Sequence, residues 1–408
     1  MTPTELRSSL SLSAIFAMRM LGLFMVLPVF ALEAARYPGG DDPTRVGLAM
    51  GIYGLTQGLL QIPFGMASDR FGRKRVIVIG LIIFALGSFI AMAATSLMGL
   101  TIGRAVQGAG AISAAVTALL ADQTRDEVRT QAMTLVGVSI ALMFALSLVV
   151  APLLAEQIGL PGLFALTGVL ALACIAVVLK VTPPEPAQSQ ERPRGSLMLV
   201  LRQPALLRLD LGVFVLHAVQ LAMWVAIPVL LVEAGLARAE HWKVYTPTVL
   251  ASFVVMRGTL YPLERRGHLR VVFLASVGLI AAVQLGLLWA LPAAGQVASL
   301  TALTWLLFFF FCGFNVLEAC QPSLTSRVAP QHARGAALGV FNTLQSLGFF
   351  TGGAAGGWLA SQYGASGVFT ACAALMLLWL AIAWPMSAPG RYGPWPAAAQ
   401  STSGRAAS

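Results

Sequence analysis

The chain has 408 residues and a formal net charge of +10, yet only 10% of its residues are charged while 58% are hydrophobic. Soluble domains carry about 25% charged residues, so this composition excludes a soluble chain of two or three domains. Lys and Arg do not cluster with interleaved aromatic residues, which argues against nucleic acid as a partner. The composition instead predicts a polytopic protein embedded in membrane lipid.

Twelve apolar stretches are long enough to span a membrane, because about 20 helical residues cross a hydrocarbon core of roughly 30 Å. They predict an all-α membrane protein with 12 transmembrane helices. The eighth stretch is the weakest, since Arg257 and Pro262 interrupt it. The predicted spans are 12–35, 46–67, 76–95, 97–121, 131–154, 162–180, 206–233, 243–262, 270–291, 297–325, 335–359 and 367–386.

A segment rich in Pro, Gln and charge, 181–205, interrupts the apolar pattern and predicts a cytoplasmic linker. It divides the chain into an N-terminal six-helix bundle, 1–180, and a C-terminal six-helix bundle, 206–386. The tail 387–408 is rich in Pro, Gly, Ala and Ser, which predicts disorder. The loop at Asp69 to Gly72 has a weak echo at Glu264 to Gly267, so the bundles are predicted to be pseudo-symmetric.

The basic residues predict the orientation. With a cytoplasmic N-terminus, four of the 26 basic residues lie outside and three lie within spans, which leaves 19 on the cytoplasmic side. This excess predicts that both termini are cytoplasmic. The four cysteines lie in apolar stretches without metal-ligand spacing, so no metal site is expected.

Three motifs carry a family resemblance. The stretch Gly65-Met-Ala-Ser-Asp69-Arg70-Phe-Gly72-Arg73-Lys74 resembles the loop 2–3 signature of the major facilitator superfamily, G-x-x-[AS]-D-R-x-G-R-K. Arg104-Ala-Val-Gln107-Gly108-Ala-Gly110 resembles the R-x-x-Q-G-x-G pattern of its drug:proton antiporters, and Gly22 with Pro28 resembles the helix 1 pattern of that group. Stretches such as Phe314-Asn315-Val-Leu-Glu318-Ala are similar to the YajR-type subgroup, whose soluble C-terminal domain is absent here.

The resemblance implies the major facilitator fold and alternating access. It also implies a network of Asp69, Arg73, Asp122 and Arg129 at the cytoplasmic face that latches the outward-open state. The alternative for this loop is a solvated basic turn that only sets the orientation. The antiporter signature of helix 5 is reduced to Ala151-Pro152 and neighbouring small residues, which leaves the direction of transport open.

Three charged or titratable residues within the spans are candidates for proton coupling: Arg104, Glu318 and His217. A charged side chain at mid-span costs roughly +2.5 to 3.5 kcal/mol on insertion scales, so each should face the bundle interior and have partners. Glu318 is the only carboxylate well inside a predicted C-terminal span. For each residue the alternative is a structural role: Arg104 bonded to carbonyls, Glu318 a neutral acid, and His217 a packing residue.

The remaining polar residues of the spans either line a substrate cavity or bond neighbouring helices. Tyr53, Gln57 and Gln61 recur at helical spacing and form one stripe, and Asn342 and Gln345 form another. The predicted cavity residues are Arg19, Tyr53, Gln57, Gln61, Gln107, Gln220, Trp224, Asn315, Gln321, Asn342 and Gln345.

These features predict a secondary transporter of the bacterial inner membrane, not an enzyme. It would act as a monomer without cofactors and export a small amphipathic or cationic compound in exchange for protons. No phosphate-binding G-x-x-x-x-G-K-[ST] motif occurs, so an ion or solute gradient would supply the energy. Two alternatives remain: a proton-coupled importer of a small metabolite, and a membrane sensor that transports nothing.

Overall fold

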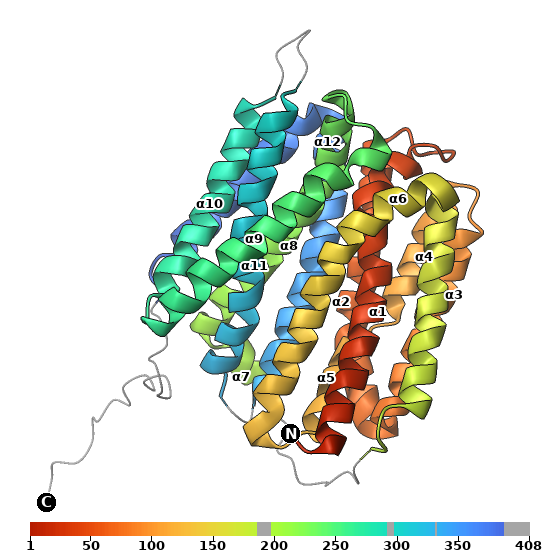
Figure 1. The fold of residues 1–408 in the computed structure, drawn as a ribbon, viewed down its shortest axis with the longest axis vertical. Helices are drawn as coiled ribbons and strands as arrows, with labels where there is room; N and C mark the ends of the chain where they lie inside the picture. Colours follow the sequence, from red (N-terminus) through yellow and green to blue (C-terminus); the bar gives the residue numbers. More distant parts are fainter. Residues whose placement is uncertain (186–196, 292–297, 331–332, 387–408) are drawn as a thin grey trace, which may run out of the picture.

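The computed structural model describes residues 1–185, 197–291, 298–330 and 333–386, and every regular element in these ranges is a helix. The predicted tail, 387–408, and the middle of the predicted linker, 186–196, lie outside the described residues. Figure 1 shows the long helices side by side along the longest axis, with the first half of the chain (red to yellow) beside the second half (green to blue). The all-helical fold class is therefore confirmed.

The first bundle, α1 to α6, consists of α1 (Pro3–Ala34), α2 (Pro43–Phe71), α3 (Arg73–Met92), α4 (Leu97–Ala109), α5 (Ser113–Asp122) and α6 (Asp126–Lys180). The predicted span 97–121 is divided into α4 and α5, because the chain leaves the helix at Gly110. The predicted spans 131–154 and 162–180 are both parts of α6, which bends at Gly159. This bend forms a helical hairpin with almost no loop.

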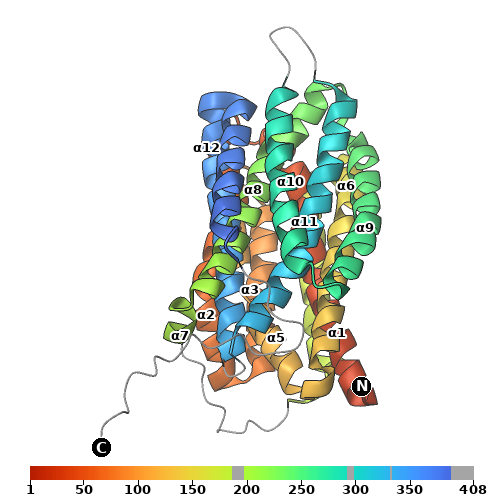
Figure 2. The same cartoon turned by 90° about the vertical axis from the view of Figure 1, so that its left-hand side faces the viewer.

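The second bundle, α8 to α12, consists of α8 (Pro204–Glu233), α9 (Trp242–Arg265), α10 (Leu269–Trp289), α11 (Leu300–Val328) and α12 (Arg334–Ala383). Two short helices, α7 (Leu197–Leu201) and η1 (Arg238–Glu240), precede α8 and α9. α12 bends at Gly364, as α6 does at Gly159. Figure 2, turned by 90°, shows α12, α10 and α11 side by side along the long axis.

Eight helical stretches in the described ranges are long and apolar enough to cross a membrane, and two of them, of 50 residues each, contain the bends in α6 and α12. The two helices below that threshold are α2 and α9, which match the second and eighth predicted spans. α2 carries the Tyr53 to Gln61 stripe, and α9 contains Arg257. The count of twelve spans stays a prediction, because these two helices are the least apolar.

Six glycines with positive φ fall at matching places in the two bundles. One pair lies in the turns after α1 and after α8. The second pair separates α2 from α3 and α9 from α10, and the third lies at the bends of α6 and α12. The φ values agree closely within pairs: Gly39 and Gly235 (both 87°), Gly72 and Gly267 (99° and 85°), Gly159 and Gly364 (62° and 63°). Residues with a Cβ rarely adopt this conformation, so glycine marks each equivalent turn. The backbone thus shows a repeat that the side chains barely retain.

The two bundles share a hydrophobic core at only one end. We call the end that holds the N-terminus and the α2–α3 turn the terminal end, and the opposite end the distal end. The distal halves of α1 and α2 belong to one core with α8 to α12. The terminal half of the first bundle has a separate core, which includes Leu12, Ile77 and Leu119 and nothing from the second bundle. The bundles are therefore joined at the distal end.

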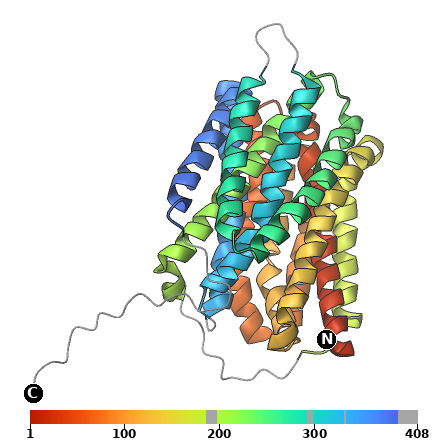
Figure 3. The same cartoon turned by 60° about the vertical axis from the view of Figure 1, so that its left-hand side comes forward.

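Glycines allow α2 and α12 to approach closely at this joint. A Cβ added to Gly47 would lie 2.2 Å from the carbonyl oxygen of Gly353, and one added to Gly353 would lie 2.6 Å from that of Gly47. Gly51 and Gly54 make similar approaches to Phe350 and Ser346. In Figure 3, which turns Figure 1 by 60°, the helices of both halves run together along the long axis. Any larger side chain on this face would force the two helices apart.

Candidate functional site

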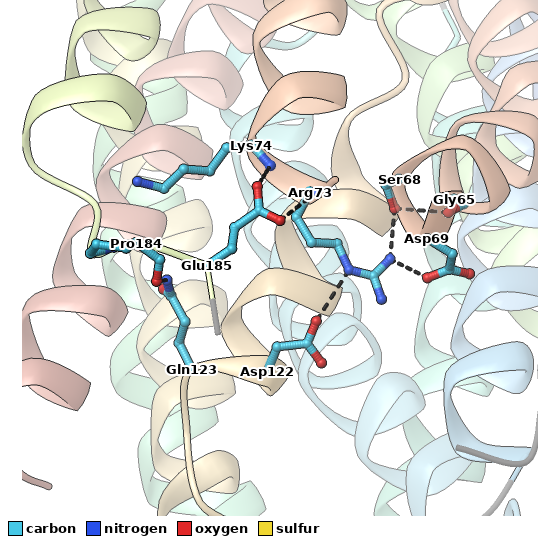
Figure 4. Close-up of polar contacts among 9 residues, drawn as sticks. All are labelled: Gly65, Ser68, Asp69, Arg73, Lys74, Asp122, Gln123, Pro184 and Glu185. Carbon is cyan, nitrogen blue, oxygen red and sulfur yellow. Dashed lines mark hydrogen bonds and ion pairs between the residues drawn. The ribbon is translucent and has the colours of Figure 1, made fainter. Parts of the chain in front are cut away.

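The turn between α2 and α3 holds the first cluster of predicted residues. Gly72 has a φ of 99°, so the chain turns sharply before α3 begins at Arg73. Arg73 pairs with Asp69 one turn earlier, donates to Asp122 at 3.2 Å and donates to the Ser68 hydroxyl at 2.7 Å. Figure 4 shows the guanidinium of Arg73 between the two carboxylates. Three members of the predicted network therefore lie together in one cluster.

The fourth member, Arg129, lies in α6, but its side chain is outside the described residues. The other loop residues are placed individually. Arg70 stacks over the Phe71 ring at 5.4 Å, and Lys74 donates to the Thr182 carbonyl at 2.6 Å. Gly65 faces the Ala114 side chain. The contacts that Arg73 and Lys74 make with Asp69, Asp122 and Thr182 lie within the first bundle or at the start of the predicted linker.

Glu185 completes this cluster, and sequence reasoning did not anticipate it. Its two carboxylate oxygens accept hydrogen bonds from the backbone N–H groups of Arg73 and Lys74, at 2.9 and 2.6 Å. These N–H groups lie at the start of α3 and have no acceptor within the helix, and the helix dipole also favours an anion there. Gln123 donates to the carbonyl oxygen of Pro183 and to that of Pro184, and Figure 4 draws Gln123 beside Pro184. The beginning of the predicted linker is thus fastened to the first bundle.

Replacing Glu185 with alanine is expected to lower stability, because two N–H groups at the start of α3 would lose their acceptors. The expected cost is about 1 kcal/mol, the usual value for a lost helix cap. The apparent melting temperature of the purified protein in detergent measures this. Glu185→Gln keeps a side-chain acceptor and should lose less. Equal melting temperatures for wild type and Glu185→Ala would contradict this role.

Two arginines are buried inside the first bundle, and neither has a carboxylate partner among the described side chains. Arg19 is 1% exposed and donates to the Tyr53 hydroxyl at 2.8 Å, to Gln57 at 3.0 Å and to Ser113 at 3.2 Å. Arg104, also 1% exposed, donates to Gln107 and lies 4.9 Å from the Tyr53 ring centre. Neutral acceptors and aromatic faces therefore surround both charges. Both side chains face the bundle interior, as their cost in a membrane requires.

In the second bundle, His217, Glu318 and Gln345 meet although they come from three helices. His217 Nε2 lies 3.2 Å from Glu318 Oε2, and Gln345 Nε2 lies 2.7 Å from His217 Nε2. Gln345 also donates to Glu318 at 3.4 Å. His217 is 2% exposed, whereas the Glu318 side chain is 39% exposed. The histidine is fixed within the bundle, and the acid remains open to solvent or ligand.

Hydrogen-bond geometry assigns the donors and acceptors in this contact. His217 Nδ1 lies 2.8 Å from the Val213 carbonyl, which only accepts, so Nδ1 carries a hydrogen. The Gln345 amide nitrogen only donates, so His217 Nε2 accepts from it and carries no hydrogen. The 3.2 Å contact between Nε2 and the Glu318 carboxyl then requires the hydrogen on the acid, because an ionised carboxylate would place two acceptors against each other.

His241, at the distal end, does not compete for this role. It follows η1 and precedes α9, and burial lowers its pKa to about 4. A weaker backbone hydrogen bond involving Leu236 raises the pKa, and the charge of Arg238 lowers it further. Since this value lies well below neutral pH, His241 stays uncharged between pH 5 and 8.

A hydrogen bond near the middle of the helices links α2 of the first bundle to α12 of the second. Gln57, which accepts from Arg19, donates through Nε2 to the Ser346 hydroxyl at 2.9 Å. Ser346 directly follows Gln345, the residue that bonds His217 and Glu318. Adjacent residues of α12 therefore contact the arginine cluster of the first bundle and the His217–Glu318 pair of the second.

Most of the other predicted cavity residues are buried among helices in this conformation. Gln107 donates to Ser88, Asn315 donates to Ser252, and Trp224 packs edge-on against Tyr245. Gln61 and Gln321 are buried, and neither amide group has a partner among the described residues; Gln220 is buried too. Asn342 is half-buried. In this conformation several of these residues therefore bond or pack between neighbouring helices.

Asp210, a further carboxylate of the C-terminal bundle, was not anticipated from the sequence. Asp210 of α8 is 1% exposed, and neither of its carboxylate oxygens has a hydrogen-bond partner in the described residues. Its place near the beginning of the predicted span concealed it, because acids there usually reach the membrane surface. The register of α8 against its neighbours was the missing information.

Comparison with known proteins agrees with this architecture. The family model of the Major Facilitator Superfamily matches residues 12–353 and 265–404. The chain is 42% identical over 393 residues to the inner membrane transport protein YajR of Escherichia coli K12, covering 95% of this chain and 85% of YajR. It is 28% identical over 361 residues to the multidrug resistance protein MdtH of Aeromonas salmonicida, covering 85% of this chain and 86% of MdtH.

Solved structures share the fold at low sequence identity. A point mutant of the nucleoside transporter NupG superposes with a TM-score of 0.72 at 12% identity, covering 92% of this chain and 98% of NupG. The human organic anion transporter MFSD10 gives a TM-score of 0.69 at 17% identity, covering 94% of this chain and all of MFSD10. At such identities the likeness concerns the arrangement of helices alone.

Proposed function

Since the chain belongs to the major facilitator superfamily of membrane transporters, we propose that it exports small amphipathic or cationic compounds in exchange for protons. The observation that carries this proposal is the contact between His217 and Glu318. The hydrogen in that contact lies on the carboxyl group of Glu318, which is partly exposed. The relatives named multidrug resistance protein support efflux of this kind.

The exchange follows from competition at Glu318. A protonated Glu318 is neutral and has no charge to attract a cation, whereas an ionised Glu318 binds a cationic substrate directly. Proton and substrate therefore occupy the acid in turn, which couples their opposite movements. Arg104, with Gln107, would hold the first bundle in shape around the substrate while the bundles rock.

Alternating access is supported by the uneven joint between the bundles. The shared core lies at the distal end, and the Arg238 guanidinium also reaches Glu33 at 3.7 Å and the Leu32 carbonyl at 3.4 Å there. At the terminal end, Asp69, Arg73 and Asp122 bond one another within the first bundle. Because the core that both bundles share lies at the opposite end, we assign this conformation as the one open to the terminal end.

The orientation belongs to the same proposal. The excess of basic residues places the terminal end, with both termini, in the cytoplasm of a bacterium, and the conformation is then inward-open. The protein would work as a monomer of two bundles, 1–180 and 206–386, in the inner membrane. Protons entering from outside would drive the substrate out.

Transport in everted membrane vesicles tests the direction. With the lumen acidified, the protein should accumulate its substrate inside everted vesicles, because the lumen corresponds to the outside of the cell. A panel of chemically distinct fluorescent cations and neutral amphiphiles supplies candidate substrates, and vesicles without the protein are the control. Accumulation only under the opposite gradient would indicate an importer. The absence of proton-linked flux across the panel, together with full function of Glu318→Gln, would favour a sensor.

A further inference from the structure

The terminal half of the second bundle contains buried polar groups that have no hydrogen-bond partner in the described residues. They are the Asp210 carboxylate oxygens on α8, the Gln321 amide and Thr325 hydroxyl on α11, and the Thr343 hydroxyl on α12. Buried polar groups are almost always paired, with protein or with ordered water. Several unpaired polar groups in one region therefore indicate ordered water, or a proton that the polar atoms share.

The helix register relates these groups to the proton-binding pair. α8 and α11 are antiparallel and touch at His217 and Glu318. Asp210 precedes His217 by seven residues on α8, and Thr325 follows Glu318 by seven residues on α11. Both therefore lie about 10 Å along the helix axes from the His217–Glu318 contact, toward the terminal end. Gln321 lies between Glu318 and Thr325. The unpaired polar groups thus lie between the His217–Glu318 pair and the terminal end.

A second register places Asp210 within the bundle. Phe214, Ala218 and Ala222 of α8 meet Gly348, Gly352 and Gly356 of α12 in parallel order. One turn nearer the terminal end, Asp210 follows on the same face of α8, level with the partly buried Leu344. The carboxyl group therefore lies in an apolar helix interface, where an unpaired ionised carboxylate is very costly.

Few charged groups could offset this cost. On the elements packed against α8 they include Arg208 and His217 on α8 itself, Glu318 and Arg327 on α11, Arg334 on α12, Arg19 on α1, and Asp69 and Arg70 on α2. None of them makes a hydrogen bond or ion pair with Asp210. The Asp210 carboxyl is therefore neutral in this conformation, which means that it carries a proton.

We propose that Asp210 is a second proton-binding site, which exchanges protons between the His217–Glu318 pair and the terminal end through water held by Gln321 and Thr325. This rests on the proposed function, because it supplies the route by which the coupled proton leaves. Asp210 first releases its proton to the terminal side as hydronium and becomes ionised. The protonated Glu318 then passes its proton along hydrogen-bonded water to Asp210, which leaves Glu318 ionised and Asp210 protonated again.

Infrared spectroscopy tests the assignment without a substrate. Protein reconstituted in lipid is titrated from pH 5 to 9, and the C=O stretch of protonated carboxylic acids is recorded. The wild type should show a protonated acid near neutral pH that Asp210→Asn removes and Asp210→Glu shifts. An exposed distal acid gives the control, since Glu240→Gln should leave that band unchanged. Identical spectra for the wild type and Asp210→Asn would overturn the proposal.

Proton-driven transport gives the second measurement. Asp210→Asn should slow proton-coupled flux about tenfold or more, while Asp210→Glu restores much of it. Unchanged flux in a folded Asp210→Asn protein would overturn the proton route, even if its infrared band is lost. The outcome is separate from the proposed function: if Glu318→Gln abolishes coupling but Asp210→Asn does not, only the Asp210 proposal fails. If Asp210→Asn folds poorly, the shifted band of Asp210→Glu decides the assignment.

Discussion

Replacing Glu318 with glutamine is expected to abolish proton-driven accumulation of substrate. The amide has nearly the same shape and can still bond His217, but it cannot release a proton. Loss of an essential proton-transfer group typically costs about two orders of magnitude or more in rate, and a similar loss is expected here. The measurement is substrate flux into vesicles under an imposed pH gradient, with the protein level checked by blotting.

A matched control separates this effect from a general loss of charge. Glu240 is an exposed acid at the distal end and pairs with Lys243. Glu240→Gln removes the same charge without touching the His217–Glu318 pair, and it should transport like the wild type. Wild-type accumulation by a folded Glu318→Gln protein would contradict the proposed coupling. A parallel loss in His217→Gln would extend the role to the histidine.

Replacing Gly353 with valine is expected to open the distal end. A Cβ at this position would lie 2.6 Å from the Gly47 carbonyl oxygen and 2.8 Å from the Gly51 Cα, so the closed joint between α2 and α12 cannot hold it. Overpacking of this kind costs about 1–3 kcal/mol. An equilibrium between two conformations would then shift by roughly 5- to 150-fold toward the one with a separated distal end.

Thiol labelling measures that shift. A cysteine at Ala31, a buried α1 residue of the shared core, should react faster with a membrane-impermeant reagent once the distal end opens. The four native cysteines are buried and contribute little background. Gly339→Val is the control on the same helix, because a Cβ at Gly339 would meet nothing within 4 Å. Equal labelling of Gly353→Val and the control would rule out this joint as the closing contact.

The sequence predicted the helices well because hydrophobic length is a local property. Ten predicted spans match helices or the parts of bent helices, and α2 and α9 match the other two at lower hydropathy. The local pattern did not show that two neighbouring spans could be parts of one bent helix. Positive φ at Gly159 and Gly364 reverses the chain within one or two residues, so two spans are joined where loops were expected.

The residues of the candidate site were also predictable only where a local motif identifies them. Asp69, Arg73 and Asp122 were recognisable because a motif fixes their spacing, and they do come together. Glu185 was hidden in a linker whose composition indicated only a tether. The contact of His217 with Glu318 depends on how α8 and α11 pack, which spacing within either helix cannot reveal. For such contacts between distant helices, a single sequence holds the participants but not their pairing.

The paired glycines described above also bear on the history of the chain. Three turns with matching backbone angles in each half are the pattern expected from duplication and fusion of one six-helix unit. The two copies have since diverged in chemistry on a common scaffold: the first holds two buried guanidiniums, and the second holds a histidine and two acids. Each copy therefore supplies what the other lacks, and neither half could take the place of its twin in a symmetric dimer.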